Sequence, residues 1–182
     1  PGALFYSISL PDGWEILGLG CCGVAASDPE NPARGVVALN HIHRGFYMLP
    51  PYTSPEAYVE GYMSQDFSLG RNRIEDMRIL SYEADQSLAS AMAQYSGFMA
   101  EARSMRCSFS VNGIPAEGSF TVVTNELMGY GTTVDFLAGV FAPADQLERE
   151  APMLLNVLGS ILILPQYRGL CLRSGGQNET DD

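Results

Sequence analysis

The sequence predicts an α+β fold in which a mainly antiparallel β-sheet is flanked by helices. Between Thr132 and Phe141 the residues alternate in two sets, as in a strand, and one set is wholly apolar: Val134, Phe136, Ala138 and Val140. After a corner at Pro143, apolar residues recur at helical steps on one side: Leu147, Ala151, Leu154, Leu155, Leu158 and Leu162. Asn112-Gly113 is a strong hairpin signal between two strand-like runs. This order of strands and helices indicates helices packed on an antiparallel sheet.

One domain of residues 1–164 is expected, since 182 residues suit a single domain. Residues 165–182 are predicted to be a C-terminal extension that is disordered from about residue 173, where the sequence becomes Gly-rich, polar and acidic. The chain begins at Pro1 without a charged and apolar leader, so we expect any upstream segment to have been removed or to lie outside this sequence.

The first part of the chain is predicted to contain strands only. Pro11-Asp12-Gly13 is a turn that joins the first two strands as a hairpin, and the two prolines within residues 28–32 are expected to prevent a helix or a central strand there. The predicted strands are Leu4 to Leu10, Trp14 to Leu19, Val24 to Ser27 and Gly35 to His43.

A helix is predicted from Thr53 or Ser54 to about Phe67. Either residue can cap it, Pro55 suits its first turn, and Glu56 stands three residues after Thr53 as in a capping box. Its apolar side is predicted to hold Tyr58, Val59, Tyr62 and Met63.

The second half of the chain is predicted to alternate between strands and helices. Ser96-Gly97 ends a helix, the strand that follows has an apolar face of Met105, Cys107, Phe109 and Val111, and Pro152 splits or kinks the last helix. The predicted segments are a loop from Ser68 to Asp76, a strand from Met77 to Tyr82, a helix from Asp85 to Tyr95, a strand from Ala100 to Val111 and a strand from Ser119 to Thr124.

Composition excludes several classes of function. A formal net charge of −11 disfavours nucleic-acid binding and an anionic membrane surface, because both need a basic patch. All ten basic residues are arginine, which excludes chemistry that depends on a lysine, such as Schiff-base enzymes and phosphate-loop NTPases. No apolar run reaches the length of a membrane span. We predict no cofactor and no nucleic-acid partner.

Two motifs are more consistent with structure than with chemistry. Gly18 to Gly23 matches the dinucleotide-binding pattern G-x-G-x-x-G, but Asp28-Pro29 follows too soon for the helix that the motif requires, so a strand connection is predicted. The cysteines lack C-x-x-C spacing, and Cys107 is predicted to be a buried free thiol. One or two disulfides remain open in an oxidising compartment.

The catalytic alternative is a metal- or thiol-dependent hydrolase. His41 and His43 share one side of a strand, which is a spacing that can bind a divalent metal, and Cys21 or Cys22 can supply a thiol. Two strand histidines near the end of a sheet are the simpler interpretation.

An aromatic, Pro-rich loop is the leading candidate for a partner site. It places many large side chains in one region, and such groups on a stiff loop lose little entropy on binding. The alternative is that the loop folds down and extends the core. The candidate partner-binding residues are Phe46, Tyr47, Leu49, Tyr52, Tyr58 and Tyr62.

Four stretches together resemble the PsbP-like α/β sandwich superfamily over about Leu4 to Leu162: Pro11-Asp12-Gly13-Trp14, Gly35 to Leu39, the Asn112-Gly113 hairpin and the helix Leu154 to Ile161. That group includes photosystem II PsbP proteins, a yeast Ran-binding import factor and bacterial DcrB-like domains. The resemblance implies a PsbP-like α/β/α sandwich, a non-catalytic accessory or binding role and a location outside the cytoplasm. It carries over no functional residue, and Gly45 to Tyr52 looks like an insertion relative to the family.

Overall fold

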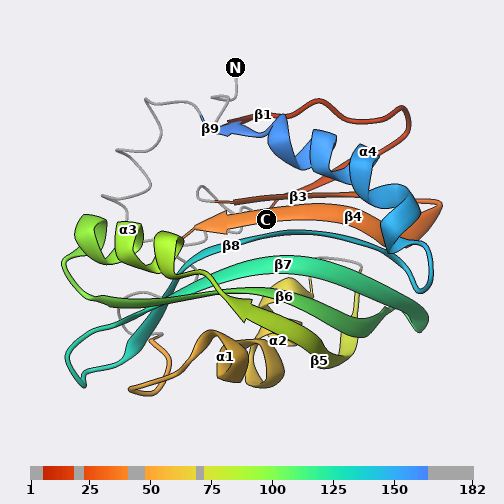
Figure 1. Ribbon diagram of the computed structural model, residues 1–182. Coiled ribbons are helices and arrows are strands. Elements are labelled where there is room, and N and C mark those ends of the chain that lie inside the picture. The colour runs from red at the N-terminus through yellow and green to blue at the C-terminus, as the bar shows by residue number, and fades with distance from the viewer. Residues whose placement is uncertain (1–5, 19–22, 41–47, 69–71, 164–182) are drawn as a thin grey trace, which may run out of the picture.

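The central element is a seven-stranded sheet (Figure 1). The computed structural model describes residues 6–18, 23–40, 48–68 and 72–163. The neighbouring strands of this sheet are all antiparallel, which confirms the predicted α+β class. In spatial order the strands are β2 (Glu15–Gly18), β3 (Gly23–Asp28), β4 (Asn31–Asn40), β8 (Thr132–Pro143), β7 (Ile114–Glu126), β6 (Met99–Val111) and β5 (Ile74–Ala84).

Helices cover both faces of the sheet, and a separate two-stranded pair lies beside the last helix (Figure 1). The helices are α1 (Pro55–Gly61) and α2 (Met63–Phe67) on one face and α3 (Gln86–Ser96) and α4 (Leu147–Gly159) on the other; the pair is β1 (Tyr6–Ser7) with β9 (Leu162–Ile163). Among the helices described, none is long and apolar enough to cross a membrane.

The core under α1 and α2 is built around four phenylalanine rings. Phe67, Phe109, Phe120 and Phe141 lie with ring centroids 5.5 to 6.5 Å apart, mostly edge to face, as aromatic pairs prefer. Gly139 makes room for this packing, because a Cβ there would overlap the Phe120 ring. One continuous cluster of buried residues results on this face.

The opposite face holds two smaller clusters, one under α4 and one under α3. A bulge in β8 changes the face on which its side chains lie. Val134 pairs with Thr124 and Phe136 with Val123, so Asp135 is an extra residue. The predicted apolar face of this strand is therefore wrong at its first member, because Val134 packs in the α1 and α2 core whereas Phe136 packs on the α3 side.

The Asn112-Gly113 hairpin is confirmed. Both residues have positive φ (53° and 80°), as a type I′ turn requires, and β6 pairs with β7 from Val111 and Ile114 to Met99 and Glu126. The pairing is longer than predicted because the alternation continues beyond Ser119 to Thr124 on both sides. The predicted apolar face of β6 is buried, and Cys107 is a buried free thiol as predicted.

Helix α3 is confirmed with its ends close to the predicted positions. The Asp85 side chain accepts a hydrogen bond from the Leu88 amide at 2.9 Å, which caps the helix start. Gly97 ends the helix in the left-handed conformation (φ 77°), which glycine adopts without a steric penalty. Both ends of the helix are set by residues next to it in the sequence, so the local sequence sufficed to predict the helix.

The predicted first hairpin is wrong. The turn is present, with the Trp14 amide donating to the Pro11 carbonyl at 3.2 Å, but β1 pairs with β9 and not with β2. Ile8, Leu10 and Trp14 pack against the cluster under α4, so contact with a distant helix outweighs the local pairing.

The segment around Pro32 was also predicted incorrectly, since β4 already begins at Asn31. The register passes from Asp28 opposite Asn31 directly to Ser27 opposite Gly35, and pairing with β8 also starts at Gly35. Pro32 thus has no ladder partner on either side, and its missing N–H costs no hydrogen bond.

One further boundary differs, and one predicted connection is confirmed. Strand β5 begins at Ile74, so the predicted loop to Asp76 was too long. Antiparallel pairing of β2 with β3, with Gly18 opposite Val24, confirms that the G-x-G-x-x-G stretch connects two strands; residues 19–22 lie outside the described part.

The helix predicted from residue 53 to Phe67 is two short helices. Tyr62 interrupts it with φ −131° and ψ −30°. Ser54 is the cap and accepts from the Ala57 amide at 3.2 Å. The predicted capping box at Thr53 is wrong, because the Thr53 hydroxyl donates to the Pro50 carbonyl at 2.6 Å instead.

The last helix is continuous through Pro152, so the predicted split is wrong. The carbonyl that loses its donor belongs to Glu148, which lies on the exposed side of the first turn, where water can take the donor's place. The predicted apolar stripe is wrong at two members: Leu155 is exposed, and Leu162 lies beyond the helix in β9. The buried side consists of Leu147, Leu154 and Val157.

Candidate partner-binding surface

The turn between β7 and β8 presents two large apolar side chains to solvent. It closes with a hydrogen bond from the Leu127 amide to the Gly131 carbonyl at 2.9 Å. Met128 has φ 52° and Gly129 φ 81°, a tight backbone that turns side chains outward. Met128 and Tyr130 are 78% and 84% exposed.

The segment before α1 is fixed to the same end of the sheet. Leu49 is buried, and it exchanges two main-chain hydrogen bonds of 3.0 Å with Thr132 at the start of β8. Three residues later Tyr52 adopts φ 61° and is 76% exposed. The buried leucine thus anchors a loop that displays the tyrosine.

The Glu126 carboxylate joins this loop to the turn. One of its oxygens accepts from the Tyr52 amide at 2.6 Å and from the Thr132 hydroxyl at 2.8 Å, and the other accepts from the Gly129 amide at 2.7 Å. Desolvation alone would raise the pKa of Glu126, but these donors favour the charged form and lower the pKa below its ordinary value. A charge-assisted link of this kind holds both tips in place.

Four exposed apolar side chains therefore lie at the same end of the sheet, and we call them the aromatic rim: Tyr52, Met99, Met128 and Tyr130. Met99 stands opposite Glu126 in the sheet and is 70% exposed. The Tyr52 hydroxyl lies beside Gly129. Single exposed apolar residues are ordinary, whereas several together on one surface mark a contact site.

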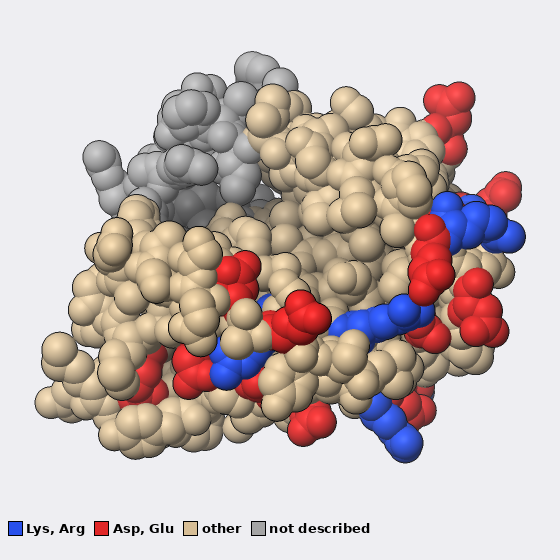
Figure 2. Space-filling view, viewed as in Figure 1, with Lys and Arg blue, Asp and Glu red and all other residues tan. Residues whose placement is uncertain are grey.

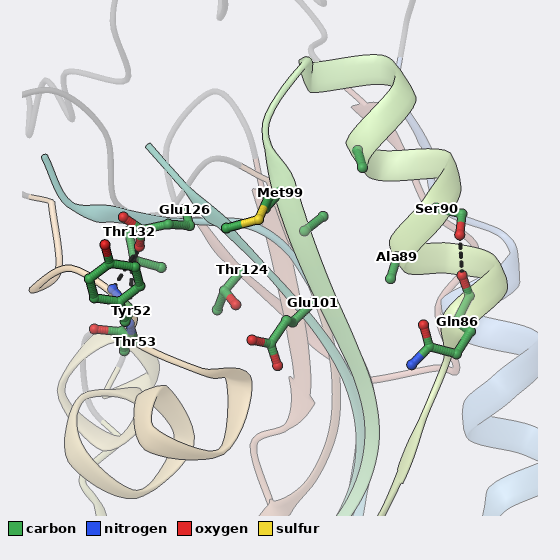
Figure 3. A pocket seen from close by; sticks show the side chains of 12 residues that line it. Tyr52, Thr53, Gln86, Ala89, Ser90, Met99, Glu101, Thr124, Glu126 and Thr132 are labelled. Carbon is green, nitrogen blue, oxygen red and sulfur yellow. Dashed lines mark hydrogen bonds between the residues drawn. The ribbon is translucent and has the colours of Figure 1, made fainter. Parts of the chain in front are cut away.

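A hollow of about 390 Å³ lies beside this rim. Figure 3 shows β6 in its middle, α3 along one side, and Tyr52 and Thr53 along the other. Small side chains from α3 and β6 (Ala89, Ala93 and Ala100) line it, and Glu101 and Glu126 supply carboxylates. The volume is within the usual range of ligand pockets.

The nearby arginine is paired with two of the carboxylates of this region. Arg103 donates from Nε to Glu56 at 2.7 Å and from one terminal nitrogen to Glu101 at 2.9 Å. Desolvation works against the charged form of Glu56, but a backbone hydrogen bond and the bond from Arg103 leave its pKa below the ordinary value. The positive charge of Arg103 is thus balanced, and the hollow is acidic overall.

A second hollow of about 330 Å³ lies near the C-terminal end of α3, lined by Tyr95, Phe98, Leu127 and others. At its edge the Asn125 amide donates to Asp135 at 2.6 Å, and both side chains are buried. The bulge at Asp135 places this carboxylate in the sheet interior.

The structure separates the six residues predicted to bind a partner. Phe46 and Tyr47 lie outside the described residues. Leu49 and Tyr58 are buried, and Tyr58 donates to Asp66 at 2.9 Å; burial, with that carboxylate beside it, raises the pKa of Tyr58 well above its ordinary value. Tyr62 is half-buried against the α1 and α2 core, so Tyr52 alone of the four described members is mostly exposed.

Sequence reasoning missed Met99, Met128 and Tyr130. The signal for the last two is Met128-Gly129-Tyr130-Gly131, in which glycines on a tight turn carry large apolar residues with no space to bury them. Met99 had no such signal in the sequence.

The residues of the predicted alternative site, His41, His43, Cys21 and Cys22, lie outside the described residues. Within the described part, no group of three or more His, Cys, Asp or Glu side chains is arranged to hold a metal ion. Cys107 is described, and burial, with Glu60 adding a smaller contribution, raises the pKa of its thiol to about 12.

Comparison with known proteins gives a likeness of fold. No protein-family model and no curated protein matches the chain. Among solved structures it is similar to the cyanobacterial PsbP (CyanoP) of Synechocystis sp. PCC 6803, with 14% identity over 88% of this chain and 87% of that one and a TM-score of 0.43. It is also similar to LpqN of Mycobacterium tuberculosis, described as involved in cell envelope biogenesis, with 16% identity over 88% and 83% and a TM-score of 0.38. This likeness agrees with the PsbP-like fold that the sequence resembles. It concerns the fold alone.

Proposed function

We propose that this protein is a non-catalytic binding domain that engages a protein partner through the aromatic rim. The observation that carries the proposal is that four large side chains, each at least 70% exposed, lie at one end of the sheet: Tyr52, Met99, Met128 and Tyr130. The proposal keeps Tyr52 from the loop predicted by sequence and adds three neighbours to it.

The support of the rim favours a binding role over accidental exposure. Glu126 accepts from both Tyr52 and Gly129, and Leu49 pins the loop to β8, so two of the tips are held before any partner arrives. Pre-ordered aromatic anchors lose little entropy on binding and act as hot spots in interfaces.

Photo-crosslinking tests the proposal. A benzophenone amino acid replaces Tyr130 in one variant and Leu155 in another; Leu155 is also apolar and exposed, but it lies on α4. In an extract of the source organism, we expect a discrete crosslinked protein from position 130 and none from position 155. Excess unlabelled protein should suppress the crosslink, and excess Tyr52→Ser/Tyr130→Ser protein should not.

Two results would contradict the proposal. One is the same crosslinked species from both positions, which indicates general stickiness. The other is full suppression of the crosslink by the double serine variant, which places the contact elsewhere.

A further inference from the structure

We infer that the hollow beside the rim is a groove in which an extended, cationic segment of the partner adds to β6 as an extra strand. The inference rests on the proposed function, since the segment belongs to the partner that the aromatic rim engages. It names how that partner binds and the chemistry that selects it.

Strand β6 is longer than β5, the strand beside it. β5 ends at Ala84, which pairs with Arg103, and the chain then turns into α3. The last contact on this side is the Asp85 amide donating to the Ala102 carbonyl at 3.0 Å. From Ala102 to Met99, β6 pairs with β7 on one side and, within the described residues, with no strand on the other.

Main-chain groups of β6 point to the side where β5 has ended. Along a strand, the N–H and C=O of successive residues point alternately to the two sides. The Ala102 carbonyl points away from β7, toward Asp85. The N–H and C=O of Ala100 therefore point the same way, into the hollow that Ala100 lines. An open edge with an available donor and acceptor is a template for another strand.

The shape of the hollow suits an extended segment. Its α3 wall carries Ala89 and Ala93, which leave space beside β6, while Tyr52 bounds the opposite side (Figure 3). Gln86 and Ser90 add polar groups to the α3 wall. A slot with an open strand edge and small residues on its wall suits an extended main chain better than a compact ligand.

Charge complementarity selects the occupant. Glu101 and Glu126 line the hollow, the charge of Arg103 is balanced by Glu56 and Glu101, and the whole chain carries −11. A cationic segment is attracted to such a groove, and an acidic one is repelled. Arginine or lysine at alternate positions of the segment would place the charges on one side of the added strand.

The test uses a displayed library of decapeptides with arginine at alternate positions and random residues between them. The best binder is then synthesised in three forms: the L-peptide, its D-enantiomer of equal charge, and an L-peptide N-methylated at alternate residues. We expect the L-peptide to bind at least tenfold more tightly than the other two, because each lost main-chain hydrogen bond is worth about tenfold. Its binding should shift amide NMR signals at Met99, Ala100 and Glu101.

Protein variants give the matching readout. Ala100→Pro removes the N–H at an edge position where proline is tolerated, and it should weaken the L-peptide about tenfold. Ala100→Ser keeps the N–H and should bind as the wild type does. If Ala100→Pro fails to fold, the enantiomer and N-methyl comparisons still decide, because they leave the protein unchanged.

Three results would overturn strand addition: no library member binds, the L- and D-peptides bind equally, or the amide shifts fall away from β6. A crosslink at position 130 that persists alongside any of them leaves the proposed function standing. If a peptide binds at β6 but no crosslink forms at position 130, the proposed function fails and strand addition at β6 is still supported.

Discussion

Two groups of aromatic and apolar side chains in this molecule have opposite surroundings. Phe67, Phe109, Phe120 and Phe141 interlock in the core under α1 and α2. The aromatic rim is exposed, and hydrogen bonds from its backbone to one carboxylate position it, whereas side-chain packing positions the phenylalanines. The first group stabilises the fold by burial. The second contributes little stability, and its exposure is the observation on which the proposed partner contact rests.

Charged side chains form clusters in two regions of the molecule. Near the start of α4, Arg34 binds Asp28 and Glu150, and Arg106 binds Glu117 and Glu148. Figure 2 shows charged side chains at the lower left, over the centre and at the right of the molecule. At the end that presents the rim, the four rim side chains themselves are uncharged, and the carboxylates of Glu101 and Glu126 lie in the hollow beside them.

Removing a ring from the buried group should have the largest effect. Phe120→Ala is expected to lower the free energy of unfolding by about 3–5 kcal/mol, because it loses burial and leaves a cavity beside the rings of Phe67 and Phe109. Urea unfolding followed by circular dichroism measures it. A loss below about 1 kcal/mol, typical of surface sites, would show that the cluster is not the main core.

Adding a methyl group beneath the same ring should have the next largest effect. A Cβ at Gly139 would overlap the Phe120 ring and the Ser119 carbonyl, so Gly139→Ala is expected to cost about 1–3 kcal/mol. Gly61→Ala is the matched control, since nothing lies within 4 Å of a Cβ there and the residue is helical. It should be neutral or stabilising by up to about 1 kcal/mol. Equal losses in both variants would point to backbone flexibility as the cause.

The sequence predicted the buried group better than the exposed one, for a physical reason. Met105, Cys107 and Phe109 alternate with polar residues, and alternation marks a buried face wherever the strand lies. The rim comes from three separate segments brought together by long-range pairing, which no local period encodes. The bulge at Asp135 and the pairing of β1 with β9 escaped prediction for the same reason.

Tyr52 and Tyr58 show the limit within a single segment. They are six residues apart, and composition alone gives both the same role. One follows an anchoring leucine into a left-handed turn, and the other falls on the inner side of α1 and is fully buried. Helical phase could have placed Tyr58 inside, whereas the exposure of Tyr52 depends on the Glu126 link.

That link predicts a smaller, pH-dependent effect. Glu126→Gln should lower the free energy of unfolding by about 0.5–1.5 kcal/mol at neutral pH, since the amide keeps only one of the two accepting oxygens. The folded state lowers the pKa of Glu126, so its contribution is present above the ordinary carboxyl pKa and is lost as the pH falls through the lower folded-state value.

The difference between wild type and Glu126→Gln should therefore shrink as the pH falls below the ordinary carboxyl pKa, and vanish below the lower folded-state pKa. Unfolding measured on both proteins at each pH cancels other titrating groups such as Glu56. Hydrogen exchange at the Tyr52 amide should quicken in the variant at neutral pH. A difference that stays constant with pH would mean that the carboxylate charge plays no part in holding the rim.

The rim side chains themselves should have the smallest effect on stability. Tyr130→Ser is expected to change the free energy of unfolding by no more than about 0.5 kcal/mol, as is usual for exposed positions, because its ring is 84% exposed. Phe120→Ala measured alongside gives the scale. The same substitution should abolish competition for the crosslink at position 130. A loss of several kcal/mol in the free energy of unfolding would instead show that Tyr130 packs against the fold. The aromatic rim would then stabilise the fold as the phenylalanines do, and the two groups would differ only in how much they contribute.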